Sequence, residues 1–321
     1  MNNHKFYQGN ALDVLKTFPE KSIDMAVTSP PYWGLRDYGI DGQLGLEPTF
    51  DLYIKHLCDI FEETKRVLKD EATLWVVLGD TYSSSGGMTH IKHLKTAKVG
   101  ATKSGIQLAS SKWRKENKFK NNIPDKSLVG IPFRFAIEMI NRGFILRNVC
   151  VWYKNNVMPS SATDRFTVDF EYIFFFSKQS KYYFEQQFEK SLQKFTTGYT
   201  PIKNPKTEKG KLRAENKGQY RSNSKETGGV GRINPKGRNK RTVWSIPTKP
   251  FKEAHFAVFP EALIKTPILA GCPPKGIVLD MFSGAGTVAV VARKQNKNTI
   301  NIELNPEYIR MAKRRLENEC N

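Results

Sequence analysis

Runs of apolar residues alternate with periodic apolar patterns along most of the chain. A run such as Leu74-Trp-Val-Val-Leu78 predicts a buried strand, whereas apolar residues spaced three and four positions apart predict an amphipathic helix. These two patterns predict strands at 5–7, 22–28, 74–78, 147–153, 170–176, 276–280 and 298–303, and helices through Leu12 and Leu15 and at 51–69, 131–141, 260–270, 286–295 and 306–316. This alternation is typical of an α/β fold with a mostly parallel sheet.

Two segments interrupt the pattern and carry almost all of the net charge. The chain has 51 lysines and arginines against 31 acidic residues, a net charge of +20. Residues 83–126, the first basic segment, hold ten basic and two acidic residues, and residues 179–241, the second basic segment, hold sixteen and five. A charge run is most often a solvated insertion. This concentration nevertheless favours a polyanionic partner, nucleic acid before a membrane surface, because neither segment has an apolar helical face.

Composition and cysteine spacing exclude several classes of protein. Hydrophobic residues make up 39% of the chain, which is enough for a folded core and argues against a wholly disordered protein. We find neither an apolar run long enough to span a bilayer nor a secretory signal pattern, so we expect a cytoplasmic protein without a membrane partner. Cys58, Cys150, Cys272 and Cys320 form no C-x-x-C pair, so neither a metal site nor a disulfide framework is expected. Cys58 and Cys150 are predicted core residues.

The segment 278–287 (Val-Leu-Asp-Met-Phe-Ser-Gly-Ala-Gly-Thr) joins a predicted strand to a predicted helix through a glycine-rich turn. Gly284 and Gly286 allow the backbone to approach a ligand closely and to adopt unusual dihedral angles. Glu303 ends the next strand, where a carboxylate can accept hydrogen bonds from both ribose hydroxyls of a nucleoside. The turn therefore predicts a cofactor that contains a nucleoside.

The glycine spacing leaves the cofactor open, and Asp280 narrows the choice. Ala289 satisfies the looser form of the dinucleotide fingerprint, so a nicotinamide or flavin cofactor fits the spacing alone. Asp280 stands just before the turn, where its carboxylate would repel a pyrophosphate but attract an ammonium group. S-adenosylmethionine has a sulfonium, an amino acid tail and a ribose, and this combination favours it as the cofactor.

A second turn, Thr28-Ser-Pro-Pro-Tyr-Trp33, directly follows the predicted strand 22–28. Two consecutive prolines remove two backbone donors, so nearby carbonyls remain acceptors. Ser29 adds a side-chain acceptor and Tyr32 an aromatic face. Such a turn can hold a flat group with an exposed amine, with two acceptors on the NH2 group and a ring beneath it. A plain turn at the end of a strand is the structural alternative.

With these two turns, the chain resembles the β class of the DNA amino-methyltransferases, in which the catalytic motif precedes the cofactor motif. The resemblance extends to Gly9-Asn-Ala-Leu12, although the family usually has Asp where Asn10 stands, and to 152–159, 164–166, 171–178 and 255–260. It covers roughly 5–80, 127–178 and 242–316, outside both basic segments. The implied fold is a Rossmann-like S-adenosylmethionine-dependent methyltransferase sheet with helices on both faces, circularly ordered and carrying basic insertions.

The resemblance also implies how the chain is divided. Residues 1–178 would form the catalytic half of the methyltransferase domain, interrupted by the insertion at 83–126. Residues 179–241 would form a basic target-recognition region. Residues 242–321 would form the S-adenosylmethionine-binding half of the same domain.

The resemblance implies three groups of site residues. The catalytic residues would be Ser29, Pro30, Pro31 and Tyr32, with the amine of a flipped base bonded to the Ser29 hydroxyl and the Pro30 carbonyl. The cofactor-binding residues would be Asn10, Ala11, Phe256, Asp280, Phe282, Ser283, Gly284, Gly286, Thr287 and Glu303. The candidate DNA-binding residues are Trp33, Arg36, Lys154, Arg165, Arg213, Arg221, Arg232 and Arg238.

Several positions have a structural alternative. Trp33 suits packing as well as a wall of the base pocket, and Asp80 suits capping of the next loop as well as lining the pocket. A surface pair with Asp37 is the default for Arg36. His255 is expected to be structural, closing the cofactor pocket.

The resemblance implies a DNA methyltransferase, and it bears on the target base. In the family, Ser at the first catalytic position accompanies N4-methylation of cytosine more often than N6-methylation of adenine, so cytosine N4 is expected and adenine N6 is the alternative. A catalytically silent DNA-binding protein is an alternative of another class, which the intact motifs disfavour. RNA and protein amide methyltransferases usually carry Asn-Pro-Pro-Tyr and place the cofactor turn first. Double-stranded DNA is the expected partner, with a homodimer, a cognate restriction endonuclease and a microbial or phage origin as further expectations.

Overall fold

The computed structural model describes residues 3–83, 107–108, 123–190, 237–249 and 259–319 of the 321-residue chain. The chain divides into two compact units, one formed by 1–185 and 242–321 and the other by 186–241. The predicted boundary between the catalytic half and the target-recognition region, at 178/179, lies close to the division between the units.

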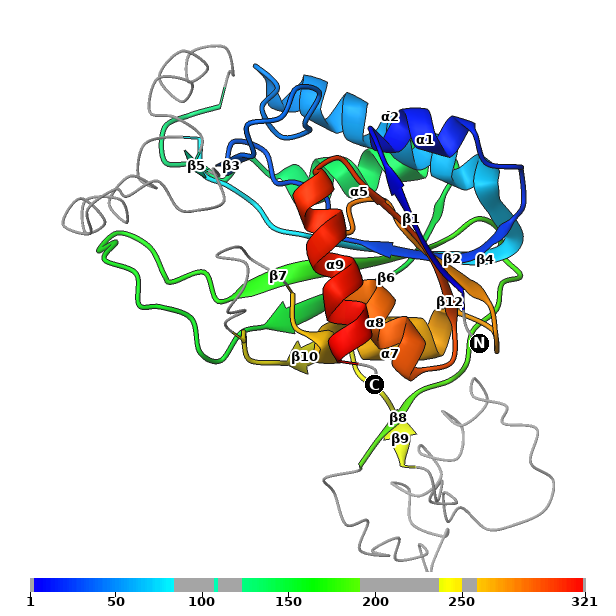
Figure 1. The fold of residues 1–321 in the computed structure, drawn as a ribbon. Coiled ribbons are helices and arrows are strands. Elements are labelled where there is room, and N and C mark those ends of the chain that lie inside the picture. The colour runs from blue at the N-terminus through cyan, green and yellow to red at the C-terminus, as the bar shows by residue number, and fades with distance from the viewer. Residues whose placement is uncertain (1–2, 84–106, 109–122, 191–236, 250–258, 320–321) are drawn as a thin grey trace, which may run out of the picture. The chain divides into compact units, whose positions relative to one another are not determined.

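The first unit is built on an eight-stranded sheet (Figure 1). Its strands are β1 (His4–Gln8), β2 (Ile23–Thr28), β4 (Leu68–Leu78), β6 (Ile145–Tyr153), β7 (Phe170–Ser177), β10 (Val243–Ser245), β11 (Ile277–Asp280) and β12 (Asn298–Glu303). They are arranged in the order β1-β12-β11-β2-β4-β7-β6-β10. Only β7 runs antiparallel to its neighbours, β4 and β6. The prediction of a mostly parallel sheet is therefore confirmed.

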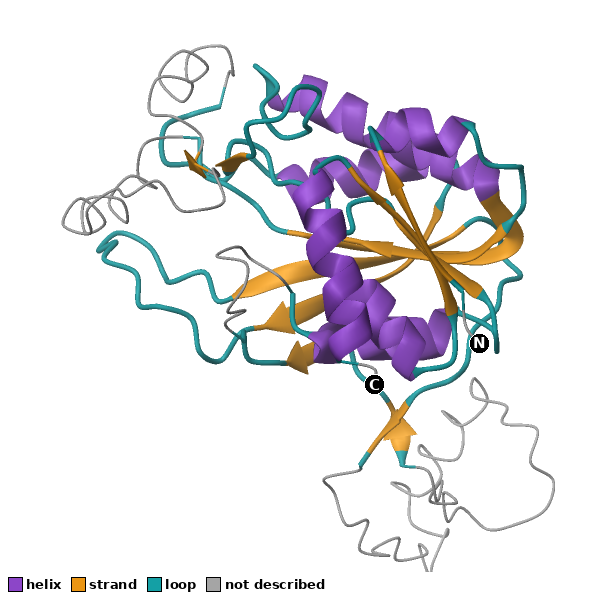
Figure 2. Cartoon of the chain, in the orientation of Figure 1, coloured by secondary structure: helices purple, strands orange, loops and turns teal. Residues whose placement is uncertain are grey.

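Helices cover both faces of this sheet, as the resemblance implied (Figure 2). The helices α1 (Ala11–Lys16), α2 (Phe50–Val67) and α5 (Ile131–Asn141) lie on one face, and α7 (Glu261–Gly271), α8 (Thr287–Lys294) and α9 (Pro306–Asn318) lie on the other. Among the described residues, no helix is long and apolar enough to cross a membrane.

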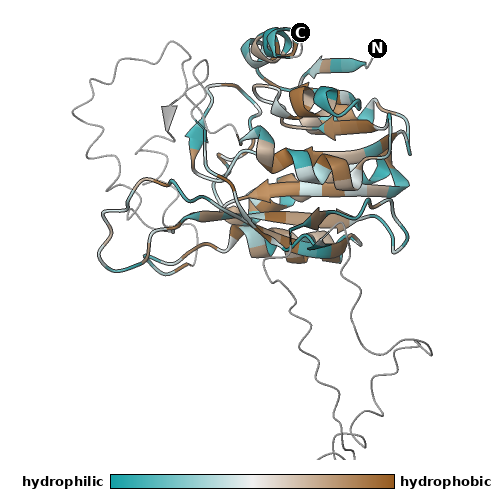
Figure 3. Cartoon of the chain, turned by 90° about the horizontal axis from the view of Figure 1, so that it is seen from below, coloured by the Kyte–Doolittle hydropathy of each residue, from teal (hydrophilic) through white to brown (hydrophobic). Residues whose placement is uncertain are grey.

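The alternation of side chains along β4 explains the two cores. Leu74, Val76 and Leu78 are buried against α1, α2 and α5, whereas Trp75 and Val77 are buried against α7 and α8. Successive residues of a strand point to opposite faces, so a continuous apolar run serves a sheet that is covered on both sides. Figure 3 shows that the central strands are mostly apolar. The predicted core cysteines Cys58 and Cys150 are buried here as well.

The cofactor motif and the catalytic motif meet at the centre of the sheet. β11 pairs in parallel with β2, although the two strands are about 250 residues apart in the chain. The chain leaves β11 through α8 toward β12, and it leaves β2 through α2 toward β4, on the other side. Ligands of open α/β sheets bind where the connections that follow two neighbouring strands run to opposite sides, outside the carboxyl ends of these strands. The circular order implied by the resemblance is thus confirmed, and it brings both motifs to this point.

The structure corrects the predicted elements in a few places. The helix predicted at 51–69 ends at Val67, and β4 begins at Leu68. The start of β4 was missed because the three residues after Leu68 are charged and form no apolar run. Short strands were also missed. β3 (Arg36–Asp37) pairs with β5 (Gln107–Leu108), which lies inside the first basic segment. In the second unit, β8 (Phe188–Glu189) pairs with β9 (Arg238–Asn239), and Glu189 forms ion pairs with Arg238 and Arg241. Strands of two residues leave no periodic signal.

Candidate active site

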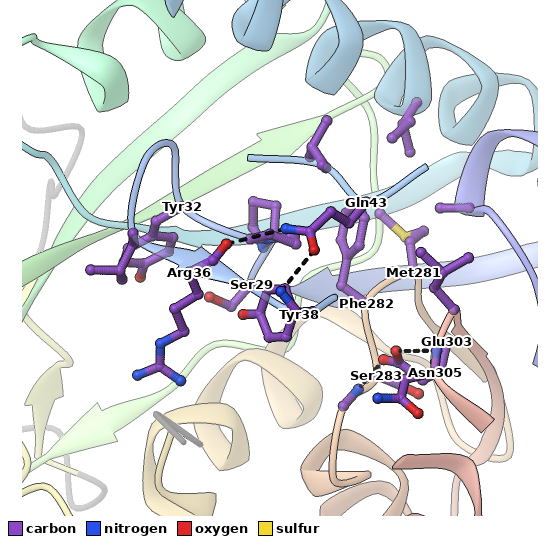
Figure 4. Close-up of a pocket in the computed structure, with 18 of the residues that line it drawn as sticks. Ser29, Tyr32, Arg36, Tyr38, Gln43, Met281, Phe282, Ser283, Glu303 and Asn305 are labelled. Carbon is purple, nitrogen blue, oxygen red and sulfur yellow. Dashed lines mark hydrogen bonds between the residues drawn. The ribbon is translucent and has the colours of Figure 1, made fainter. Parts of the chain in front are cut away.

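The loops after β2, β11 and β12 line one cavity of about 1080 Å³. The catalytic turn and the glycine turn, predicted independently, both open into it. The predicted site residues that line this cavity are Asn10, Ala11, Ser29, Pro30, Pro31, Tyr32, Arg36, Lys154, Phe282, Ser283, Gly284, Thr287 and Glu303. In Figure 4, Ser29 and Tyr32 lie on one side and Ser283, Glu303 and Asn305 on the other. We call these the base side and the cofactor side.

The two glycines of the cofactor side have different structural reasons. Gly286 precedes α8 with φ of +75°, and a Cβ there would lie 2.7 Å from the Cβ of Ala312 on α9, so only glycine fits. Gly284 also has a positive φ, of +48°, but a Cβ there would meet nothing within 4 Å. Gly286 therefore serves helix packing, whereas Gly284 leaves its space to the cavity.

Glu303 is fixed by backbone groups at the end of β12. Its Oε2 accepts a hydrogen bond from the Gly284 N–H at 2.8 Å, and its Oε1 accepts one from the Asn305 N–H at 2.9 Å. Burial raises the pKa of this carboxyl, and the backbone donors oppose that rise. The Ser283 hydroxyl beside it is buried without a hydrogen-bond partner among the described residues. Polar groups buried without a partner call for a ligand or a water.

Asp280 joins the two motifs beneath the cavity. The Thr28 hydroxyl, at the end of β2, donates to Asp280 Oδ1 at 2.6 Å, and the Phe282 N–H donates to the same oxygen at 3.1 Å. Complete burial raises the pKa of Asp280 to about 7, although both hydrogen bonds oppose the rise. A carboxylate this deep is a costly charge without a cationic partner.

The base side is built around Tyr32. Its hydroxyl donates to Glu171 Oε2 on β7 at 2.7 Å, and the Tyr53 hydroxyl on α2 donates to the Pro31 carbonyl at 2.8 Å. Among the described residues, none donates a hydrogen bond to the Pro30 carbonyl. Burial raises the pKa of Tyr32 well above its ordinary value, so its hydroxyl stays protonated and can donate. Of the carbonyls at the turn, those of Pro31 and Tyr32 thus accept hydrogen bonds from the chain itself, the latter from the Leu35 N–H at 3.3 Å.

A loop between the catalytic turn and α2 forms the remaining wall. Gln43 holds it together, because its side chain accepts from the Tyr38 N–H at 2.7 Å and donates to the Arg36 carbonyl at 3.1 Å (Figure 4). Asn10 caps α1 by accepting from the Leu12 N–H at 2.9 Å. This helix-capping role explains how Asn replaces the Asp usual in the family, since both are good N-cap residues.

Two residues with open roles are structural. Trp33 is buried, packs edge-on against Phe50 and donates from Nε1 to the Glu47 carbonyl at 2.9 Å, which supports packing over a DNA contact. The Asp80 carboxylate accepts from the N–H groups of Gly130 and Ile131 at 3.0 to 3.1 Å. It therefore caps the N-terminus of α5 and does not line the cavity.

The other candidate DNA-binding residues lie in different settings. Lys154 lines the cavity but forms an ion pair with Glu171, and Arg165 lies over the ring of Tyr82 at 3.7 Å from its centroid. Arg36 lines the cavity from β3. Arg238 lies in the second unit, paired with Glu189. The remaining DNA-binding candidates, Arg213, Arg221 and Arg232, lie outside the described residues. The cofactor candidate Phe256 and His255 lie outside them as well.

Sequence reasoning missed the residues that support the Tyr32 turn from distant positions in the chain. Glu171 lies on β7, Tyr53 on α2 and Gly79 directly after β4, and only Glu171 stands in one of the motifs that carry the resemblance. A Cβ on Gly79 would lie 2.8 Å from Cε2 of Tyr32, so this glycine, at the end of β4, makes room for the ring. A lone glycine after an apolar run was the single available signal. Among the described residues, no cluster of three or more His, Cys, Asp or Glu could hold a metal ion.

The fold and the two motifs around one cavity define a methyltransferase, and comparison with known proteins specifies which kind. A family model described as DNA methylase matches residues 23–314. The chain therefore belongs to the N6/N4 DNA methylase family.

Similar proteins support this assignment. The chain is 38% identical over 320 residues to the Type II methyltransferase M.Cfr9I of Citrobacter freundii, covering 99% of this chain and 89% of that protein. It is 36% identical to the Type II methyltransferase M.SmaI of Serratia marcescens, covering 97% and 90%.

Solved structures show the same fold at lower identity. PvuII DNA methyltransferase (cytosine-N4-specific) superposes with a TM-score of 0.61 at 19% identity, covering 98% of this chain and 86% of that one. A putative DNA modification methylase from Thermus thermophilus, solved in complex with S-adenosyl-L-methionine, gives a TM-score of 0.56 at 21% identity, covering 99% and 94%.

Proposed function

We propose that this DNA methylase transfers the methyl group of S-adenosylmethionine to the N4 amine of a cytosine flipped out of double-stranded DNA. One observation carries the proposal: the Ser29–Tyr32 turn and the glycine turn with Glu303 line a single cavity. Two reactants bound there would be held side by side, and positioning of this kind accounts for much of an enzyme's acceleration.

The cofactor side fits S-adenosylmethionine. Glu303 is placed to accept hydrogen bonds from ribose hydroxyls, and the space beside Gly284 admits close approach of the ligand. The buried, unpartnered Ser283 hydroxyl can bond a polar group of the ligand. Asp280, when ionised, would stabilise positive charge near the amino acid tail. When bound, S-adenosylmethionine supplies an electrophilic methyl group.

The base side fits an exocyclic amine. The lone pair of such an amine is conjugated into the ring, which makes it a weak nucleophile. The Ser29 hydroxyl and the Pro30 carbonyl would accept hydrogen bonds from its two N–H groups and favour a more tetrahedral nitrogen. The same two acceptors would stabilise the positive charge that develops on nitrogen as it bonds to the methyl carbon. The bond from that carbon to sulfur would break, S-adenosylhomocysteine would leave, and the methylated amine would lose one proton to water. Tyr32 would offset part of the cost of unstacking the base.

The choice of cytosine rests on Ser29. Ser at this position accompanies cytosine N4 more often in the family that the chain resembles. The likeness to the PvuII enzyme supports only the fold, because 19% identity carries no information on the target base.

We further propose that the second basic segment recognises the target sequence, with Arg213, Arg221, Arg232 and Arg238 on DNA phosphates. Its charge supports binding to DNA, because each neutralised phosphate releases counterions and tightens binding, and the place of this segment in the resemblance supports target recognition. Two of the relatives are named Type II methyltransferases, which supports a cognate restriction endonuclease as a partner in the cell.

Identification of the modified nucleoside tests the proposal. Purified protein is incubated with unmethylated DNA and S-adenosylmethionine, and the DNA is digested and analysed by mass spectrometry. We expect N4-methylcytosine, and a loss of about a hundredfold in rate for Ser29→Ala, because an acceptor to the developing charge is removed. Ser22→Ala is the matched control, since Ser22 lies before the start of β2 and bonds the Pro19 carbonyl.

Two outcomes would contradict the proposal in different ways. N6-methyladenine would keep the enzyme and overturn the choice of base. No modified base, despite S-adenosylmethionine binding by calorimetry, would overturn methylation of DNA by this chain.

A further inference from the structure

A side-chain network that no motif predicted lies behind Tyr32. The Tyr32 hydroxyl donates to Glu171 Oε2 at 2.7 Å, and the Lys154 ammonium donates to the other carboxylate oxygen. Glu171 lies on β7 and Lys154 directly follows β6, its antiparallel neighbour. Both oxygens of the carboxylate are therefore engaged by the chain itself.

The Lys154–Glu171 pair is held firmly in the cavity wall. The two side chains are 17% and 18% exposed, and the Lys154 ammonium lies 4.6 Å from the centroid of the Trp152 ring. The Lys154 N–H also donates to the Asp169 carbonyl at 2.7 Å, which closes the β6–β7 hairpin at this point. Hydrogen bonds to charged groups are stronger when water is largely excluded.

The Tyr32 ring packs against the core, and its position is tight. Gly79 contacts its edge: a Cβ there would lie 2.8 Å from Cε2 of the ring and 3.4 Å from Cγ of Glu171. Tyr53 fixes the backbone at the Pro31 carbonyl, and the Ser29 hydroxyl forms a hydrogen bond with the Tyr32 hydroxyl. The bond to Glu171 is the charge-assisted contact of this hydroxyl, and it fixes the far edge of the ring.

We infer that Glu171 is a positioning residue, which holds the Tyr32 ring at the angle needed to stack on the target base, and that Lys154 holds Glu171. This inference rests on the proposed function, in which Tyr32 stacks on a flipped base. It assigns Lys154 to the wall of the base pocket instead of to a DNA phosphate.

Positioning differs from direct contact in a way that can be measured. A carboxylate that touched the amine itself would affect methyl transfer whatever residue stood at position 32. A carboxylate that acts through the Tyr32 hydroxyl has no effect once that hydroxyl is absent. Double-mutant cycles separate these two cases.

The test compares Glu171→Gln in two backgrounds, wild type and Tyr32→Phe. Tyr32 and Lys154 bond different oxygens of the carboxylate, and Gln replaces one of these oxygens by an NH2 group, which cannot accept. In the wild-type background we expect single-turnover methyl transfer to slow by about tenfold, the size of one charge-assisted hydrogen bond. In the Tyr32→Phe background, which is itself slowed to a similar extent, Glu171→Gln should change the rate by less than about twofold.

A second readout separates stacking from a general loss of structure. The methylated site is first located in the DNA. A second DNA is then prepared with a mismatched base opposite the target base at that site. A mispaired base costs less to unstack, so the pocket needs less help from Tyr32. The rate defect of Glu171→Gln should therefore shrink on mispaired DNA, whereas a folding defect would persist.

The control is Glu71→Gln, which removes an exposed carboxylate that pairs with Lys181 at 3.5 Å. Equal effects of Glu171→Gln in both backgrounds, or no effect in the wild type, would overturn the positioning role while the enzyme stays active. A wild-type protein that binds S-adenosylmethionine but modifies no DNA would instead overturn the proposed function and this inference with it.

Discussion

The cofactor side and the base side of the cavity differ in the groups that hold them. On the cofactor side, Glu303 is fixed by backbone N–H groups, one of them from Gly284, 19 residues earlier. On the base side, Tyr32 is fixed by the side chain of Glu171, 139 residues later, which Lys154 holds in turn. The first arrangement depends on a short stretch of chain, whereas the second depends on the assembled sheet.

This difference explains which site residues a sequence can reveal. Backbone donors in a glycine turn leave a compact signature, because the turn itself requires particular residues at fixed spacing. Side chains that meet only in the folded sheet leave no spacing to detect. The comparison predicts that changes on the cofactor side alter ligand affinity, whereas changes on the base side alter the rate of methyl transfer.

The largest effect is expected from Asp280→Ala. Asp280 lies beneath the cavity and does not line it, so its charge would act on a cationic ligand through the buried surroundings. Removal of this carboxylate should weaken S-adenosylmethionine binding by about a hundredfold. Calorimetric titration measures this affinity. Asp13→Ala, an exposed change on α1, is the control and should leave the affinity as it is. An affinity retained in Asp280→Ala would remove this residue from the cofactor side.

A smaller effect, on the other side, is expected from Gly79→Ala. The new Cβ would lie 2.8 Å from the Tyr32 ring and push it from its position. Methyl transfer should slow by about ten- to thirtyfold, because a misplaced contact in a packed site costs rate. S-adenosylmethionine affinity, measured in parallel, should change by less than about twofold. A comparable loss of affinity would show that the two sides are not separable.

The effect that is smallest near neutral pH is a dependence on pH that enters through Asp280. Its pKa is about 7 in the folded chain against an ordinary 3.8, so the folded state retains a proton that the unfolded state releases. The stability that this group contributes is complete below pH 3.8 and is lost as pH rises toward 7. Ionised Asp280 is the form that attracts a cation, so S-adenosylmethionine affinity should rise by up to about tenfold per pH unit as the pH increases toward 7.

Asp280→Asn supplies the comparison for this pH effect. Denaturant unfolding of the free protein at pH 5, 6 and 7 should show the falling stability in the wild type and a flatter profile in the variant. Calorimetry over the same range should show the opposite trend in wild-type affinity. Parallel profiles for the two proteins would mean that another group titrates.

The sequence predicted the main strands and helices of the first unit. β2 and β11 were each marked by an apolar run followed by a turn motif, and α5 matched its predicted range in full. Two-residue strands such as β3 and β8 escaped because pairing across a loop decides them, not periodicity. The polar start of β4 escaped because its partner strand, β2, defines it.

The candidate site divides in the same way. Ser29, Tyr32, Gly284 and Glu303 were predicted from motifs and lie together around the cavity. Trp33 was ambiguous because an aromatic side chain serves a core as well as a pocket, and its partner Phe50 is far enough away to give no local pattern. Glu171 could not be assigned from sequence, since its role exists only when β7 lies beside β4.

The hydrogen bond between Thr28 and Asp280 spans 252 residues, and this has a consequence for synthesis on the ribosome. When β2 has emerged, β11, which pairs with one of its edges, has not yet been made. The edge stays open while the second basic segment is translated, and the sheet closes only when β11 and β12 follow. Long-range strand pairing of this kind is slow and exposes unpaired edges in the interval. A nascent chain therefore acquires its cofactor side last, so the catalytic turn is made well before any methyl donor can bind beside it.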